Sequence, residues 1–229
     1  MLTYAIGDIH GKLDMLVELL ALIEKDAKGE NYKLVFVGDY IDRGPNSRGV
    51  IDHLIKLQAL RDQYGLETIC LMGNHEDMAV NDQFKDSWVM NGGAATLMSY
   101  PDKVISAEHV AWIKALPMYH ETDYNYFAHA SVVPNIPLNE HTPVQLMWTR
   151  YRYEEQSGLD KVLIHGHTPV KRPEITIDRI NIDTGAVFLD HGYGRLTAAK
   201  IPAGTGTPSD FLYVQEDFLS SRVNSLMGE

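Results

Sequence analysis

The sequence has a single cysteine among its 229 residues, Cys70, and this excludes an intramolecular disulfide. Cys70 lies within the apolar run 68–72, where a cysteine is more typical of a small buried side chain than of a nucleophile. A chain without disulfides fits a reducing compartment. We therefore expect a cytoplasmic protein.

The sequence also lacks a long hydrophobic run. No stretch approaches the ~18 continuous apolar residues that a membrane-spanning helix requires. The first residues enter a short strand-like run directly, without the basic region and apolar core of a secretory signal. We therefore expect neither export nor a membrane anchor.

Positive charge is scarce, because 20 Lys and Arg residues stand against 31 Asp and Glu residues, which gives a formal net charge of −11. A protein that holds a polynucleotide on a broad basic surface carries the opposite sign, so we expect no stable nucleic-acid binding. Bound divalent cations would offset part of the acidic excess. Any phosphate-bearing substrate must then be bound by a few local cationic groups.

The hydrophobic content of 45% is that of an ordinary globular protein with a sizeable core. We expect one domain over residues 1–229, in which 203–229 is a peripheral C-terminal extension. Within this extension, 203–208 is rich in Gly, Thr and Pro and predicts a loop. The pattern over 210–227 predicts a weakly amphipathic helix.

Short apolar runs that end in glycine and a polar residue recur three times in the first third of the chain. They predict buried strands at 2–6, 34–37 and 68–72. Between them, apolar residues at helical spacing predict helices over 12–25 and 47–60. This alternation implies parallel strands with polar loops at their carboxyl ends.

From residue 124 onward, short predicted strands are separated by Gly, Pro and Asn turns. These strands are expected at 124–128, 162–164, 175–177, 179–182, 186–189 and 196–201. Together, the two halves predict an α/β fold of two packed mixed β-sheets flanked by helices.

The loop Gly7-Asp8-Ile9-His10-Gly11 brings a carboxylate and an imidazole to one side of an extended chain, because alternate residues of a strand point the same way. Such a pair suits Mn²⁺, Fe or Zn²⁺ better than Ca²⁺, which prefers oxygen ligands alone. On its own, the pair is equally typical of a hydrogen-bonded strand end.

Two further loops repeat this pattern. The segment 38–45, Gly-Asp-Tyr-Ile-Asp-Arg-Gly-Pro, places an acidic residue after a strand and adds an Asp-Arg pair. The segment 73–76, Gly-Asn-His-Glu, supplies an amide and a second histidine at a predicted helix start. Each segment alone fits a helix-capping loop, but three such loops in succession favour a metal site.

The ordered motifs GDIHG, GDYIDRG and GNHE resemble the signature of the phosphoprotein phosphatase branch of the calcineurin-like metallophosphoesterases. Later elements of that signature are also present, namely YFAHA at 126–130, WTR at 148–150, GHTP at 166–169 and DTGAV at 183–187. The resemblance covers residues 3–200, and the compact length is similar to the bacterial and bacteriophage lambda-type members.

The resemblance implies the α-β-β-α sandwich of that superfamily and a site for two divalent metal ions, with Mn²⁺ preferred and Fe or Zn as alternatives. It assigns Asp8 and His10 to one ion and makes Asp39 the bridge between the two. The ligands of the second ion would be completed by Asn74, His129 and His167.

Two histidines lie close together at 165 and 167. The family pattern Gly-His-Thr assigns the metal to His167 and leaves His165 as a partner of a ligand, and an exchange of the two is the main alternative. Pro169 stands where many other metallophosphoesterases have a further histidine. This favours the protein phosphatase branch over nucleases and phosphodiesterases.

Two ions about 3.5–4 Å apart would lower the pKa of a bridging water enough to supply hydroxide for in-line attack. The leaving alkoxide then needs a proton, which we expect from His75 as general acid, with Asp42 orienting its imidazole and raising its pKa. Arg43 and Arg150 are expected to bind phosphate oxygens, because a guanidinium donates two hydrogen bonds at once. Arg152 is an alternative to Arg150.

Three other features have expected roles near this site. Asp183 is expected to close the core behind the ions and to accept a hydrogen bond from a ligand histidine. The segment 88–93 either lines the substrate cleft or simply connects two helices. Ser131 replaces a glycine that is common in the family after His-Ala, which would change the loop geometry without removing a ligand.

The sequence thus predicts a metal-dependent phosphomonoester hydrolase, and specifically a protein serine/threonine phosphatase acting on a phosphorylated protein or small phosphoester. A symmetrical diadenosine tetraphosphate hydrolase is the nearest alternative, but such enzymes typically replace the aspartate found here as Asp42. A broad phosphatase that also accepts phosphotyrosine would use the same site. A non-catalytic metal-binding scaffold is disfavoured because every predicted ligand and the His75–Asp42 pair are intact.

Overall fold

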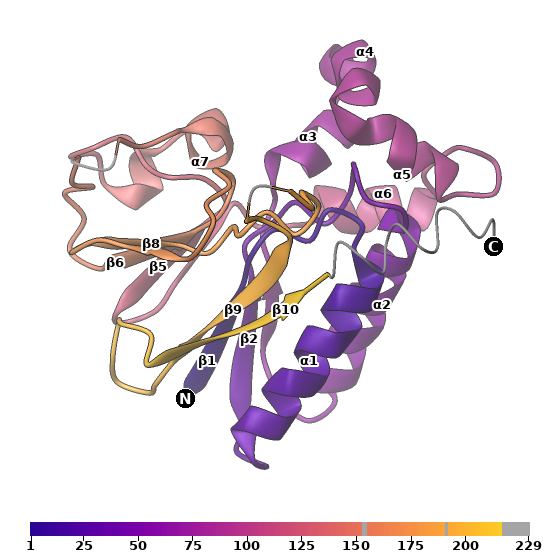
Figure 1. Cartoon of the computed structure of the whole chain (residues 1–229). Helices are drawn as coiled ribbons and strands as arrows, with labels where there is room; N and C mark the ends of the chain where they lie inside the picture. Colours follow the sequence, from indigo (N-terminus) through magenta and orange to yellow (C-terminus); the bar gives the residue numbers. More distant parts are fainter. Residues whose placement is uncertain (153–154, 191, 217–229) are drawn as a thin grey trace.

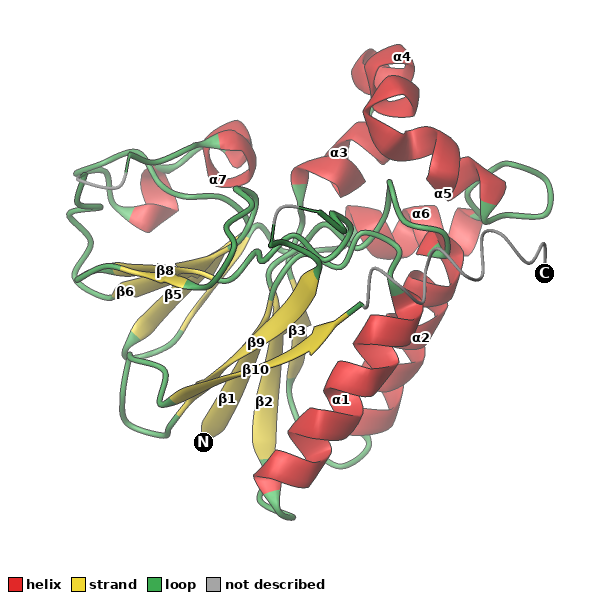
Figure 2. Ribbon diagram, viewed as in Figure 1, coloured by secondary structure: helices red, strands yellow, loops and turns green. Residues whose placement is uncertain are grey.

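The computed structural model describes residues 1–152, 155–190 and 192–216. They form two five-stranded sheets, with long helices over the outer face of the first sheet and short helices at the end where the polar loops meet (Figures 1 and 2). No helix among these residues has both the length and the apolar character needed to cross a membrane. The prediction of two mixed sheets flanked by helices is confirmed.

The first sheet has the strand order β10-β9-β1-β2-β3. Its strands are β1 (Leu2–Ile6), β2 (Tyr32–Phe36), β3 (Thr68–Cys70), β9 (Arg195–Ile201) and β10 (Asp210–Gln215). The first three run parallel, as the alternation of strands and helices predicts, so their carboxyl ends lie at the same edge. β9 and β10 extend the sheet in antiparallel order.

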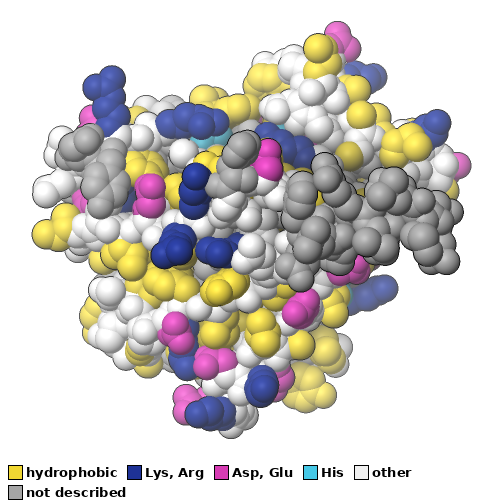
Figure 3. Space-filling view, in the orientation of Figure 1, with side chains coloured by type: hydrophobic (Ala, Val, Ile, Leu, Met, Phe, Trp, Pro, Cys, Tyr) yellow, Lys and Arg dark blue, Asp and Glu magenta, His cyan; other side chains and the backbone are white. Residues whose placement is uncertain are grey.

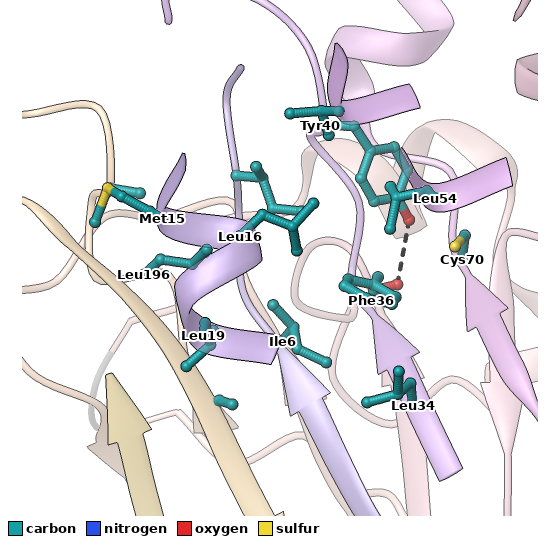
Figure 4. Packing of buried hydrophobic residues seen from close by; sticks show 14 of the residues in the cluster. Ile6, Met15, Leu16, Leu19, Leu34, Phe36, Tyr40, Leu54, Cys70 and Leu196 are labelled. Atoms are coloured by element: carbon teal, nitrogen blue, oxygen red, sulfur yellow. Dashed lines mark hydrogen bonds between the residues drawn. The ribbon is translucent and has the colours of Figure 1, made fainter. Parts of the chain in front are cut away.

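Two helices cover the outer face of this sheet, α1 (Leu13–Ala27) and α2 (Ser47–Asp62). Apolar residues at helical spacing on α1, including Leu16 and Leu19, pack against Ile6 and Phe36 of the sheet (Figure 4). The side chain of Asn46 caps α2 by accepting a hydrogen bond from the Gly49 N–H at 3.0 Å. This packing fixes the strand ends that carry the polar loops.

Between β3 and the second sheet, short helices lie above the polar loops (Figure 1). These are α3 (Asn74–Val80), α4 (Lys85–Trp88), α5 (Ala94–Met98) and α6 (Ala107–Lys114), with a 3₁₀ turn at Asp82–Phe84 and a π turn at Val89–Gly93. Trp88 and Tyr100 pack with Met78 in a separate apolar cluster beneath them. These helices therefore have a small core of their own next to the polar loops.

The second sheet has the order β4-β5-β6-β8-β7, with β5, β6 and β8 parallel. Its strands are β4 (Tyr119–Glu121), β5 (Asn125–Ala128), β6 (Val162–His165), β7 (Glu174–Ile175) and β8 (Arg179–Asn181), and the connection from β5 to β6 contains a 3₁₀ turn at Leu138–Glu140 and α7 (Pro143–Trp148). A second apolar cluster joins the inner faces of the two sheets, where Val35 packs with Phe127 and Ile164.

Two strand predictions for the strand-rich half are wrong in detail. The segment 186–189 is a turn rather than a strand, because Gly185 has φ +68° and its carbonyl accepts a hydrogen bond from the Phe188 N–H at 2.8 Å. The strand expected at 175–177 is reduced to β7. The loop at 203–208 is present.

The helix expected at 210–227 is also wrong where the chain is described, because 210–215 forms β10. Leu212 and Val214 alternate with Phe211 and Tyr213, and this period of two matches a strand that pairs with β9. Val214 is buried in the cluster that includes α1. Residues 217–229 lie outside the described part of the chain.

Candidate active site

The predicted metal ligands meet at one place because each closely follows a strand. Asp8 and His10 follow β1, Asp39 follows β2, and Asn74 begins α3 just after β3. The second sheet contributes two more, one after β5 and one after β6, namely His129 and His167. All six are buried, with 8% exposure or less.

The backbone around these residues is unusually strained. Eight described non-glycine residues have a positive φ, and five of them are predicted site residues: His10, Asp39, Asp42, Arg43 and His167. Each non-glycine residue with a positive φ destabilises the folded state by about 1–3 kcal/mol, which the surrounding structure must offset. Glycine would remove the strain, but it would also remove the functional group.

Two glycines in the motifs are explained by the carboxylates beside them. A Cβ at Gly166 would lie 2.0 Å from Asp8 Oδ1, and one at Gly73 would lie 2.3 Å from Asp39 Oδ1. Any side chain at either position would displace a predicted ligand. These glycines are therefore required by close approach and not by their φ angles.

The surroundings of His129 fit a bound cation. Its Nδ1 lies 2.9 Å from the carbonyl oxygen of Val37, so Nδ1 carries the proton and donates it there. Its Nε2 then offers a lone pair to Asn74 Oδ1 at 2.9 Å and to Asp39 Oδ1 at 3.4 Å, which are themselves acceptors. Acceptors that face one another in a buried site need a cation between them, and the donor set fits a transition-metal ion.

His10 and His167 also direct ring nitrogens into the site. His10 Nδ1 lies 2.8 Å from the Ile41 carbonyl oxygen, which leaves Nε2 directed into the site, 3.6 Å from Asp39 Oδ2. His167 Nδ1 lies 3.0 Å from Asn74 Oδ1. Burial lowers the pKa of both imidazoles to about 3, so both are neutral near pH 7 and can act as ligands.

The carboxylates of the site repel one another in the absence of cations. Burial raises the pKa of Asp8, and the charges of Asp183 and Asp39 raise it further. Ligand atoms of Asp8, Asp39 and His129 lie within 4.8 Å of one another, and so do those of His10, Asp39 and His75. Asp39 belongs to both groups, which is the arrangement that two ions sharing one carboxylate require.

His75 and Asp42 form a buried pair beside these groups. His75 Nδ1 lies 2.6 Å from Asp42 Oδ2, and its Nε2 faces the site, 4.0 Å from Asp39 Oδ2. Because Asp42 binds the Nδ1–H, the imidazole is held in one orientation with Nε2 available for proton transfer. The arrangement fits a general acid, although ligation by the same nitrogen is the competing interpretation of the geometry.

Asp42 is held by side chains that the sequence reasoning missed. Trp88 Nε1 donates to Asp42 Oδ2 at 2.8 Å, and Thr96 Oγ1 donates to Asp42 Oδ1 at 2.6 Å. Thr96 Oγ1 also accepts from the Asp42 N–H at 2.9 Å. Trp88 belongs to the segment 88–93, but its sequence carries no signal that connects it to Asp42.

Glu76 is the other residue with a missed role. Its buried carboxylate accepts hydrogen bonds from the backbone N–H groups of Asp39 and Tyr40, both at 2.8 Å, and from that of Gly73 at 3.1 Å. It thereby ties the loop after β2 to the loop after β3. Glu76 is the last residue of the motif GNHE, and this position could have identified it from the sequence.

Arg43 and Arg150 approach the site from different segments. Arg43 Nη1 lies 2.7 Å from His10 Nε2, and its guanidinium lies near Phe188, with Cζ 5.8 Å from the ring centre. Burial raises the pKa of Asp183 to about 7, while the charges of Arg43 and Arg150 act in the opposite direction. In the space-filling view, histidine atoms reach the surface between Lys and Arg side chains (Figure 3).

Arg152 and His165 are placed differently from Arg150 and His167. The described hydrogen bonds of the exposed Arg152 are both at its carbonyl oxygen, which accepts from Arg179 Nη2 at 2.7 Å and from the Glu155 N–H at 2.9 Å. His165 Nδ1 lies 3.0 Å from the carbonyl oxygen of Gly166, and its ring packs against Tyr151. The geometry therefore favours His167 over His165, and the charge of Arg150, unlike that of Arg152, lowers the pKa values of His167 and Asp183.

The side chains of Asp183 and Ser131 differ in their hydrogen bonding. Asp183 Oδ1 accepts a hydrogen bond from the Gly185 N–H at 2.9 Å, and no hydrogen bond joins it to a histidine among the described residues. The Ser131 N–H donates to the Thr149 carbonyl oxygen at 3.1 Å. The Ser131 hydroxyl is buried without a hydrogen-bond partner in the described chain.

Strand ends from two sheets thus converge on buried carboxylates and neutral imidazoles next to two arginines, which is the site of a metal-dependent phosphoester hydrolase. The sequence matches the calcineurin-like phosphoesterase family over residues 1–192. The chain belongs to this family, and it is a hydrolase that acts on phosphoesters.

Two of the similar proteins have different named activities. The chain is 31% identical to serine/threonine-protein phosphatase 1 of Salmonella typhimurium, over 86% of this chain and 91% of that protein. It is 29% identical to the asymmetrical bis(5'-nucleosyl)-tetraphosphatase PrpE of Halalkalibacterium halodurans, over 86% of this chain and 89% of that protein. A yeast protein serine/threonine phosphatase similar to human PP5 shares the fold, with a TM-score of 0.63 at 16% identity, over 95% of this chain and 80% of that chain.

Proposed function

We propose that this chain is a protein serine/threonine phosphatase that uses two divalent metal ions, with Mn²⁺ as the preferred metal and Fe or Zn as alternatives. The observation that carries the proposal is the buried His75–Asp42 pair, with Nδ1 and Oδ2 2.6 Å apart, at the edge of the ligand cluster. The similarity to the Salmonella phosphatase over most of both chains supports it. The free, buried Cys70 fits a reducing cytoplasm.

Six residues would hold the ions. Asp8 and His10 would bind one of them, and Asp39 would bridge both, because its two oxygens face different histidines. The second ion would be held by Asn74, His129 and His167. When bound, the ions would polarise the phosphoryl group and activate the attacking water.

The remaining groups act on the substrate directly. Arg43, beside His10, and Arg150, on the segment next to His167, would donate hydrogen bonds to the phosphate oxygens. His75 Nε2 would give its proton to the oxygen of the leaving serine or threonine. Asp42 would hold the imidazole for this transfer through the hydrogen bond to Nδ1.

Hydrolysis of a dinucleoside tetraphosphate is the second candidate, favoured by the similarity to PrpE over 86% of this chain. That relative is named for asymmetrical cleavage, whereas the motifs alone suggested a symmetrical enzyme as the alternative. A chain that cleaves phosphoanhydrides has a leaving group of low pKa, which has less need of a general acid. The intact His75–Asp42 pair therefore favours phosphomonoesters.

A substrate panel tests the proposal. The Mn²⁺-loaded protein should hydrolyse a phosphoserine or phosphothreonine peptide with a higher kcat/KM than a phosphotyrosine peptide or diadenosine tetraphosphate. Removal of the ions with a chelator should abolish turnover, and Mn²⁺ should restore it while Ca²⁺ should not, because nitrogen ligands disfavour Ca²⁺. A preference for the dinucleotide would overturn the assignment in favour of the second candidate.

A further inference from the structure

Tyr151 directly follows Arg150, and its side chain connects this segment to the second sheet. Its hydroxyl donates to Glu174 on β7. Its ring lies edge-on to the ring of His165 on β6, with the ring centres 5.2 Å apart and the planes at 83°. The guanidinium of Arg179 on β8 covers the ring, with Cζ 4.1 Å from its centre. One side chain thus contacts three strands.

Arg179 holds the backbone of the same segment. Its Nη2 donates to the Arg152 carbonyl oxygen at 2.7 Å, and the residue is only 2% exposed. A buried cation needs compensating contacts, and the face of the Tyr151 ring provides one of them. The buried guanidinium of Arg179 therefore contacts both residues that follow Arg150, namely the ring of Tyr151 and the backbone of Arg152.

Asn181 links Tyr151 to the metal-site loops. Its Nδ2 lies 2.7 Å from the Thr168 carbonyl oxygen and 3.4 Å from the Tyr151 hydroxyl, and its Oδ1 accepts from the Asp183 N–H at 3.0 Å. Thr168 immediately follows His167. We call Tyr151, Arg179 and Asn181 the Tyr151 clamp.

The residues that precede Arg150 also contact the loops that carry the predicted ligands His129 and His167. The Thr149 carbonyl oxygen accepts from the Ser131 N–H at 3.1 Å, two residues beyond His129. The ring of Trp148 lies 6.0 Å from that of His167, at 78°. The backbone from 148 to 152 is therefore fixed at both ends between the two histidine loops, while the Arg150 side chain itself is exposed.

We propose that the Tyr151 clamp consists of positioning residues for the phosphate-binding Arg150. A long, exposed side chain reaches a substrate reproducibly only when the backbone that carries it is fixed. The clamp supplies that restraint from the strands of the second sheet, and through Asn181 it sets the position of Arg150 relative to His167. This inference rests on the proposed role of Arg150 in phosphate binding.

The chain contains a matched control for this arrangement. Tyr32 also donates its hydroxyl to a glutamate, Glu24, at 2.8 Å, and the guanidinium of Arg61 also covers its ring, with Cζ 4.4 Å from the centre. Arg61 Nη2 likewise donates to a backbone carbonyl oxygen, that of Tyr32. Tyr32 begins β2, at the opposite end of that strand from Asp39. A substitution at Tyr32 therefore measures how much stability is lost when such a contact is removed away from the site.

A double-mutant cycle tests the proposal, with p-nitrophenyl phosphate as substrate and inorganic phosphate as competitive inhibitor of the Mn²⁺-loaded protein. We expect Tyr151→Leu to raise KM and the phosphate inhibition constant about tenfold, with kcat much less affected, because Arg150 is displaced. In the Arg150→Ala background, the same change should have no further effect. Tyr32→Leu should lower the unfolding temperature and leave both constants unchanged.

The inference is overturned if Tyr151→Leu leaves KM unchanged, or if it has the same effect with and without Arg150. If Tyr151→Leu does not fold, the same cycle with Tyr151→Phe, which keeps the ring, and Arg179→Lys, which keeps the charge, decides the question. Failure of the proposed function is a separate result, because it would appear as no turnover of phosphoserine peptide by the unaltered protein.

Discussion

In residues 1–100, every predicted site residue lies in the loop or helix start that follows a parallel strand, whereas in residues 120–200 Arg150 follows α7 and is distant from any strand along the chain. The first region holds its loops through a buried carboxylate, Glu76, which binds backbone N–H groups of two loops. In the second region, side chains from three separate strands contact the two residues that follow Arg150. The first arrangement joins two loops that directly follow parallel strands, and the second joins a segment outside the strands to the second sheet.

The predicted metal ligands connect the two regions. The His167 N–H donates to both oxygens of Asp8, at 3.3 and 3.1 Å, and His129 Nδ1 donates to the Val37 carbonyl oxygen at 2.9 Å. Asn74 Oδ1 lies near nitrogens of both histidines. The contrast between the regions therefore concerns the groups that we propose to act on the substrate, His75 in the first region and Arg150 in the second.

The largest effect is expected in the first region, from His75→Asn. We expect kcat for a phosphoserine peptide to fall about 10²–10⁴-fold, because the serine alkoxide needs a proton from Nε2. The fall should be much smaller for p-nitrophenyl phosphate, whose leaving group is stable without protonation. Steady-state kinetics on both substrates and metal analysis of the purified variant check this.

The metal content is the control for this prediction. The variant should keep as much bound Mn²⁺ as the unaltered protein, since His75 is expected to act on the proton and not on the ion. Loss of one ion from the variant, with equal losses of kcat for both substrates, would mean that His75 is a ligand.

The next largest effect is expected in the second region, from Arg150→Ala. Loss of a charge-assisted hydrogen bond to phosphate should reduce kcat/KM about 10- to 100-fold, mainly through KM. The matched variant is Arg152→Ala, which should leave kcat/KM unchanged because only the carbonyl oxygen of Arg152 has a described hydrogen bond near the site. Equal losses in the two variants would remove the distinction between these arginines.

The sequence predicted the first region well because its structure is local. A strand, a glycine and a polar residue are adjacent in the chain, and parallel strands bring such loops to the same edge. This reasoning located Asp8, Asp39 and Asn74 together, and the structure places them in one buried cluster. The choice of His167 over His165 came from the resemblance and not from spacing.

The residues that hold the site residues in place through tertiary contacts could not be predicted in the same way. Trp88 and Thr96 contact Asp42 across 46 and 54 residues, from short helices without a clear apolar period. The Tyr151–Glu174 contact spans 23 residues and joins a loop to an edge strand. Such contacts are set by tertiary packing, which neither periodicity nor motif spacing reports.

The errors in secondary structure have the same origin. The segment 210–215 has four consecutive apolar residues between Asp210 and Gln215, which fits a short strand, but the expected helix was assigned over 210–227 as one element. Pairing with β9 decided the outcome for the described part. At 186–189, four consecutive apolar residues suggested a strand, whereas the positive φ of Gly185 turns the chain.

The smallest kinetic effect is expected from Trp88→Phe. This variant tests whether a contact to Asp42 that the sequence did not predict contributes to turnover. The change removes the indole N–H that donates to Asp42 Oδ2, while Thr96 still donates to Oδ1. A hydrogen bond to a charged group contributes about 1.5 kcal/mol or more, so we expect kcat to fall about tenfold with KM nearly unchanged. The measurement is steady-state hydrolysis of a phosphoserine peptide.

Trp112→Phe is the matched control for Trp88→Phe, because the Trp112 indole also donates a hydrogen bond, to Gln58 Oε1 at 2.8 Å, but away from Asp42. Both variants should lower the unfolding temperature, and only Trp88→Phe should lower kcat. If the two lower kcat equally, the indole of Trp88 contributes to stability alone. Asp42 would then be oriented by Thr96 and by neighbouring backbone groups, without a contribution from the Trp88 indole.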